Sequence, residues 1–86
     1  MRVNISYSME LDDIPRKVMS LIEEAHDQAG EAGGLLVASI ERIGKDNHLA
    51  ALESIKEFRE TMGAIDYRLE DCIHILSGYS KAVADL

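Results

Sequence analysis

The sequence predicts a mainly α fold, an antiparallel two-helix hairpin with a short N-terminal β-strand. Two such hairpins are expected to dimerise into a four-helix bundle. Three observations indicate this fold. Apolar residues recur every three or four positions through most of the chain, which is the period of an amphipathic helix. The one turn-like break in that pattern is the GKDN segment at residues 44–47. Residues 3–10 instead alternate between apolar and polar, which is the period of a strand. At 86 residues the chain forms a single domain, 1–86.

The N-terminal strand is expected over residues 1–11. Its apolar positions are Val3, Ile5, Tyr7 and Met9. A lone strand leaves its backbone N–H and C=O groups unpaired, so it needs a second strand beside it. We expect it to pair with its symmetry mate across a two-fold axis and to lie on the helix ends. The alternative is that it extends the sheet edge of a different protein.

The first helix is expected over residues 14–43. Asp12 or Asp13 can cap its exposed N–H groups, and Pro15 is tolerated in the first turn because its missing N–H would have no partner there. At the other end, Gly44 suits the left-handed conformation that ends many helices.

A glycine-rich segment, AGEAGG at residues 29–34, lies in the middle of this helix. Each glycine costs a helix about 1 kcal/mol relative to alanine. Two explanations are open. The glycines allow a close approach of the second helix, or the first helix kinks or breaks at Gly33 and Gly34.

The second helix is expected over residues 47–86, after the turn at 44–47, with Asp46 or Asn47 as its N-cap. Its apolar stripe lasts about five heptads without a proline, a length of repeat typical of coiled coils. Because the connection is short, the two helices must run antiparallel.

Folding the chain about residues 45–46 predicts which residues lie at the same level. The expected facing pairs include Leu36 with Ile55 and Ile40 with Leu52, and Ala29 comes level with Met62. Both helices then have more apolar surface than one neighbour can cover, so two hairpins should pair into a four-helix bundle. The predicted interface comprises Val3, Ile5, Tyr7, Met9, Phe58, Ile73, Leu76, Tyr79 and Val83.

The composition of the chain limits the classes of molecule that it can bind. The net charge of −7 disfavours nucleic acid and anionic membrane surfaces, and no apolar run is long enough to span a bilayer. Cys72 is the single cysteine, so an internal disulfide is excluded. A free thiol without a signal-peptide pattern predicts a cytoplasmic protein. The expected partners are a second copy, with higher oligomers open, or an unknown protein.

Two histidines each follow a carboxylate by three residues, as Glu23 and His26 and as Asp71 and His74. In a helix that spacing puts both side chains on one face, and Glu-x-x-His occurs in di-iron bundles. The hairpin register separates the two histidines by about 12 Å along the bundle. Neither histidine has the following lysine and glycine of a phosphotransfer domain. We therefore expect solvated helix-face residues, with no metal and no cofactor.

The other candidate groups also favour structural roles. Cys72 lies on the apolar stripe beside acidic residues, a setting that raises a thiol pKa, so we expect a core position and not a reactive one. His48, in the turn, is expected to be solvated. An acidic cluster in the first helix is typical of a solvated face, although it could dock a basic partner. It comprises Glu23, Glu24, Asp27 and Glu31.

Three pieces of the chain carry a resemblance to a known group: VNISYSMELDDIP at the start, MGAIDYRLEDC in the second helix and ILSGYSKAV near the end. They resemble small uncharacterised proteins of T4-like tailed phages that infect marine cyanobacteria. The resemblance covers most of the chain but includes no functional motif. It implies the cytoplasm of an infected bacterial cell and a small accessory role.

The sequence thus predicts a non-enzymatic helical-hairpin oligomer that acts in protein interaction or assembly. The alternative is an adaptor or inhibitor that binds a host or viral protein through its N-terminal strand or its acidic helix face. A metal- or phosphate-handling bundle enzyme is the third and weakest hypothesis.

Overall fold

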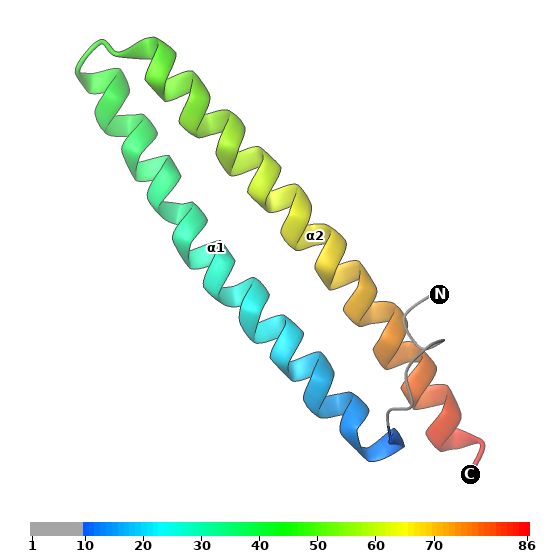
Figure 1. Ribbon diagram of the computed structural model, residues 1–86. Helices are drawn as coiled ribbons and strands as arrows, with labels where there is room; N and C mark the ends of the chain where they lie inside the picture. Colours follow the sequence, from blue (N-terminus) through cyan, green and yellow to red (C-terminus); the bar gives the residue numbers. More distant parts are fainter. Residues whose placement is uncertain (1–9) are drawn as a thin grey trace.

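The computed structural model describes residues 10–86, which form one antiparallel helical hairpin (Figure 1). A 3₁₀ turn, η1 (Leu11–Asp13), leads directly into α1 (Ile14–Gly44). After a turn at residues 45–47, α2 (His48–Ala84) returns along the full length of α1. The molecule is a rod of 61 × 19 × 18 Å, which is the width of two helices packed side by side. The predicted two-helix hairpin is confirmed.

The predicted strand falls mainly on residues 1–9, which lie outside the described part of the chain. Its expected end at residue 11 is wrong, because Leu11 begins η1. Residues 10–86 contain no strand. The helix bounds differ from the predicted 14–43 and 47–86 by one or two residues, as is usual at helix ends.

The start of α1 differs from the prediction in its capping. Neither Asp12 nor Asp13 caps the helix with its side chain: Asp13 occupies the N-cap position and makes no such hydrogen bond. An N-cap side chain reaches the first N–H groups when its own backbone is extended. Here the backbone of Asp13 is already helical, with φ −88° and ψ −13°, because η1 runs on into α1. Pro15 does lie in the first turn, as expected.

The end of α1 is a Schellman motif, a standard helix stop in which two N–H groups fold back onto the last turn. Asn47 donates its backbone N–H to the carbonyl of Arg42 at 2.8 Å, and Asp46 donates to Ile43 at 3.0 Å. The left-handed residue is Asp46, with φ 59°. The prediction that Gly44 would take this role is wrong, because Gly44 is still helical.

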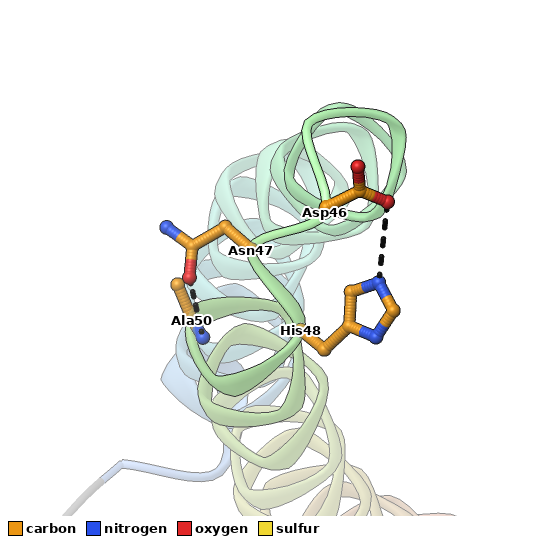
Figure 2. Close-up of polar contacts among 4 residues, drawn as sticks. All are labelled: Asp46, Asn47, His48 and Ala50. Atoms are coloured by element: carbon orange, nitrogen blue, oxygen red, sulfur yellow. Dashed lines mark hydrogen bonds and ion pairs between the residues drawn. The ribbon is translucent and has the colours of Figure 1, made fainter.

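The same turn starts α2. The Asn47 side chain accepts a hydrogen bond from the backbone N–H of Ala50 at 3.3 Å, which confirms the predicted N-cap (Figure 2). On the other side of the turn, Nε2 of His48 lies 3.7 Å from the Asp46 carboxylate, and both side chains are well exposed. Asp46 therefore ends α1, and Asn47, the next residue, begins α2.

The two helices meet along a row of mostly small side chains, here called the seam. Its most buried members recur every seventh position in each helix, which is the repeat of a coiled coil. They are Val18, Ala25, Ala32 and Ser39 on α1 and Ala51, Ile65 and Cys72 on α2, with half-buried Phe58 completing the second row. Ser54, three positions after Ala51, is also buried in the seam.

Two contacts across the seam set the register of the hairpin. Ser39 meets Ser54, and Arg68 pairs with Glu24. This register is within about two residues of the predicted one. The expected facing pairs are nevertheless wrong as seam contacts: Ile40 and Leu52, for example, are exposed to 71% and 56%. The helices are rotated so that alanine and serine fill the seam.

The glycine-rich segment has neither of the predicted roles within the hairpin. α1 runs through Gly33 and Gly34 without a break. A Cβ atom added at Gly30, Gly33 or Gly34 would meet nothing within 4 Å, so α2 does not approach closely there. These glycines leave open space on the surface of the hairpin.

Candidate self-association surface

The large apolar side chains of the hairpin stand beside the seam. Each follows a seam residue by four positions, which adds about 40° of rotation beyond a full helical turn. On α1 this row comprises Ile22, Ala29, Leu36 and Ile43, and on α2 it comprises Ile55, Met62, Leu69, Leu76 and Val83. All but half-buried Met62 are exposed. A second, outer row follows each seam residue by one position. Its apolar members are Met19, Gly33, Ile40, Leu52 and Ile73, and Arg59 and Asp66 stand between the last two.

The rows from the two helices lie on the same side of the hairpin. In an antiparallel pair, positions that stand on one flank of the seam in one helix stand on that flank in the other helix too. An open groove of about 370 Å³ near the turn shows this directly, because it is lined by Ile43 of α1 together with Leu52 and Ile55 of α2. We call the combined surface of both rows the apolar face.

The opposite flank of the seam, called the charged flank, carries charged residues. Among the positions that precede a seam residue by one, Lys17, Glu24, Glu31, Glu57 and Asp71 are charged, and the others are Ala38, Ala50, Ala64 and Gly78. The ion pair between Arg68 and Glu24 joins α2 to α1 on this flank. One side of the hairpin thus carries charged and small residues, and the other carries most of the large exposed apolar residues, which water solvates poorly.

The balance between core and surface is unusual. Within residues 10–86 six apolar residues are buried, and three of these are alanines, namely Ala25, Ala32 and Ala51. In contrast, fifteen large apolar residues are exposed, including Ile40 at 71%. Scattered exposed apolar residues are normal, but a continuous patch of them is typical of an interaction site.

The predicted interface residues fall into three groups. Val3, Ile5, Tyr7 and Met9 lie outside the described residues. Phe58 and Tyr79 are half-buried on the seam, in the repeat of Ile65 and Cys72, so they pack within the hairpin. Ile73, Leu76 and Val83 are exposed on the apolar face.

Sequence reasoning missed other members of this surface, because it merged the seam and the apolar face into a single stripe. It did not assign Ile22, Leu52 or Leu69 to an interface. The signal that separates the two surfaces is a second seven-residue repeat, offset by four positions from the row of small residues. On α1, small residues in one repeat and mostly large ones in the other distinguish the internal seam from the exposed apolar face.

The candidate chemical groups are not brought together. His26 and His74 are both exposed, and the nearest carboxylate to His26 is Asp27, at 3.6 Å. Within residues 10–86 no cluster of histidine, cysteine and carboxylate side chains could hold a metal ion. Neither of the two helices in this range has the length and apolarity needed to cross a membrane.

Cys72 is a seam residue, as predicted, and is only 4% exposed. Burial raises the pKa of its thiol above the usual value, and the carboxylate of Asp71 raises it further, while Arg68 acts in the opposite direction. A buried thiol with a raised pKa is a poor nucleophile, because the thiolate is the reactive form. Cys72 therefore contributes packing.

No protein-family model, curated protein or solved structure matches this chain. The resemblance to phage proteins remains a prediction that depends on the three sequence pieces. What the hairpin does must be inferred from its own residues and geometry, and the apolar face is their most informative feature.

Proposed function

We propose that this protein is a non-enzymatic building block that self-associates through its apolar face and acts in protein assembly. The observation that carries the proposal is the contrast between six buried apolar residues, half of them alanine, and fifteen exposed large ones, eleven of which lie on the apolar face. The single free thiol fits a reducing cytoplasm, which in a phage-infected cell would be that of the bacterial host.

A second copy suits the apolar face by size. One side of a rod 61 Å long and 19 Å wide offers roughly 1,000 Å², more than the roughly 800 Å² that each partner buries in a standard interface. The face is long and straight and lies on two helices, so another pair of helices matches it along its whole length. Two such hairpins make a four-helix bundle, in which apolar positions of both copies fill one core.

The stability of a single hairpin supports the same conclusion. Domains of this length rarely gain more than roughly 3–5 kcal/mol from one core, and they usually need a disulfide, a metal or an oligomer in addition. Cys72 is a free cysteine, and the described residues hold no metal cluster. Association therefore supplies the burial that the seam lacks.

The second candidate function is that of an adaptor or inhibitor, in which a different protein covers the apolar face, the acidic face or the N-terminal segment. The exposure of Glu23, Asp27 and Glu31 is compatible with a basic partner. The two functions differ in a simple observable: an adaptor is a monomer until its partner arrives.

The test is the solution mass of the full chain, measured by light scattering on a sizing column. We expect a mass at least twice the 9.5 kDa of one chain. Replacing Ile40 and Ile73 together by glutamate should produce a helical monomer, because both side chains are exposed on the apolar face. Leu86→Glu is the matched control, since Leu86 is 93% exposed beyond the end of α2. A monomeric wild-type protein would contradict self-association and favour the adaptor hypothesis.

A further inference from the structure

We infer that two copies pack their apolar faces antiparallel, with the turns at opposite ends and the two-fold axis crossing the rod near Ala29. This inference rests on the proposed self-association and adds its geometry. A two-fold dimer of flat-sided rods has two possible arrangements. An axis along the rod puts both turns at the same end and sets α1 against the partner's α2. An axis across the rod puts the turns at opposite ends and sets each helix against its own copy.

Charges in and beside the outer row of α2 favour the axis across the rod. Arg59 and Asp66 occupy the middle of that row, and Lys56 and Glu70 stand next to it. All four side chains are exposed, and within residues 10–86 none of them joins an ion pair.

An axis between residues 62 and 63 of α2 brings Arg59 opposite the partner's Asp66 and Lys56 within one residue of the partner's Glu70. Symmetry repeats each contact, so the dimer gains four ion pairs between opposite charges. Complementary charges of this kind set the orientation of an interface.

The same axis also matches the apolar residues. On α2 it sets Leu52 against the partner's Ile73. The Arg68–Glu24 and Ser39–Ser54 contacts place residue 29 of α1 level with residues 63–64 of α2, within about one residue of the axis. On α1, Ile22 then meets the partner's Leu36. One position of the axis thus matches apolar residues on both helices and opposite charges on α2.

The arrangement with both turns at one end also matches apolar residues, since Ile40 lies level with the partner's Leu52, but it lacks the charge complementarity. There α1 faces the partner's α2 at the same level, so Glu23 lies near the partner's Glu70, and Arg59 lies near the partner's Gly33. Two like-charge contacts replace the four ion pairs, and juxtaposed like charges oppose a wrong arrangement.

The shape of the face leads to the same result. The groove near the turn lies between Ile43, Leu52 and Ile55. With the turns at the same end, this groove would face the partner's groove, and the hollow would stay unfilled. With the turns at opposite ends, the partner's Ile73 comes to the groove and fills it. Interiors and tight interfaces are close-packed, so the second arrangement is favoured.

The glycine-rich segment gains a role in this geometry. Ala29 and Gly33 are the small members of the apolar face on α1, and no atom comes within 4 Å of a Cβ added at Gly33. At the axis α1 crosses its own copy, and small side chains there allow the two backbones to approach closely. The close approach in this geometry is between two copies of α1, whereas the sequence predicted one between α1 and α2.

Crosslinking tests the geometry in the full chain. Ala29→Cys, made in a Cys72→Ala background, should form a covalent dimer under mild oxidation, because the two residues at position 29 meet at the axis. Glu31→Cys in the same background is the control, since Glu31 lies on the charged flank, and it should stay monomeric on a non-reducing gel. A mixture of Ala29→Cys and Met62→Cys chains should give no mixed dimer, whereas both turns at one end would give this product.

The outcomes separate the inference from the proposed function. A dimeric mass without the crosslink at position 29, or with the mixed product, overturns the antiparallel geometry and leaves self-association intact. A monomeric mass overturns both. In the wild-type background, Arg59→Glu should raise the dimer dissociation constant at least tenfold, and adding Asp66→Arg should restore it to within about threefold. Failure of this charge swap to restore the dimer would also overturn the geometry.

Discussion

The hydroxyl oxygens of Ser39 and Ser54 lie 2.5 Å apart across the seam and are buried together. Each hydroxyl also has a carbonyl of its own helix within reach: that of Leu35 at 2.8 Å from Ser39 and that of Ala51 at 3.0 Å from Ser54. Since each serine has one hydrogen to donate, one of them donates across the seam while the other donates to its own helix. The pair is therefore satisfied in two equivalent ways.

Replacing one serine should cost less than removing a buried polar partner usually does. In Ser39→Ala, the hydroxyl of Ser54 still donates to the carbonyl of Ala51, so the free energy of unfolding should fall by about 1 kcal/mol. The double variant, Ser39→Ala with Ser54→Ala, should lower the free energy of unfolding by clearly less than the sum of the two single changes. The reason is that neither hydroxyl remains to lack its partner across the seam. Urea unfolding at one protein concentration measures all three variants. Strict additivity would contradict the shared hydrogen bond.

The turn offers a stabilising substitution at Asp46. This residue has φ 59°, a left-handed conformation that costs most side chains about 1 kcal/mol and glycine almost nothing. Asp46→Gly should therefore raise the free energy of unfolding by about 0.5–1 kcal/mol, even though it removes the exposed contact with His48. The thermal midpoint reports the change. Asn47→Ala is the opposite control and should lower stability by about 1 kcal/mol through loss of the cap.

Gly34 should be a second stabilising site. It is helical and exposed, and a Cβ added there would meet no atom within 4 Å. Gly34→Ala should therefore raise the free energy of unfolding by up to about 1 kcal/mol. It should leave the dimer dissociation constant unchanged, because Gly34 lies off the apolar face. Chemical unfolding and sizing together check both parts, and a weakened dimer would show that the face extends further around α1.

The thiol of Cys72 should react slowly in the folded protein. Burial and the Asp71 carboxylate raise its pKa, so the thiolate is scarce near pH 8. Alkylation by iodoacetamide should be at least tenfold slower in the folded protein than in urea.

The raised pKa of Cys72 also predicts a pH dependence of stability. The folded state holds the thiol proton more tightly than the unfolded state, whose pKa is near 9.0. This contribution is fully present below pH 9 and is lost as the pH rises through the folded-state pKa. Cys72→Ala should therefore flatten the decline in stability above pH 9, measured by thermal unfolding. If stability above pH 9 declined equally in Cys72→Ala and in the wild type, the raised pKa of Cys72 in the folded state would be contradicted.

The sequence predicted the elements of the hairpin better than its faces. Pro15, the short turn and long apolar periodicity were sufficient for two antiparallel helices. The rotation of the helices was harder to predict, because Leu36 and Ala32 both fit an apolar stripe, and only packing decides that alanine enters the seam. The Gly44 prediction failed because the left-handed position lies two residues later, at Asp46, a residue type that less often adopts it.

The seam buries six apolar residues, half of them alanine, and leaves fifteen large ones exposed. If the chain self-associates as proposed, the folded fraction depends on its concentration by mass action. A cell that makes few copies would then hold weakly stable hairpins open to proteases, and one that makes many would hold durable bundles. The amount synthesised would thereby set the lifetime of each chain.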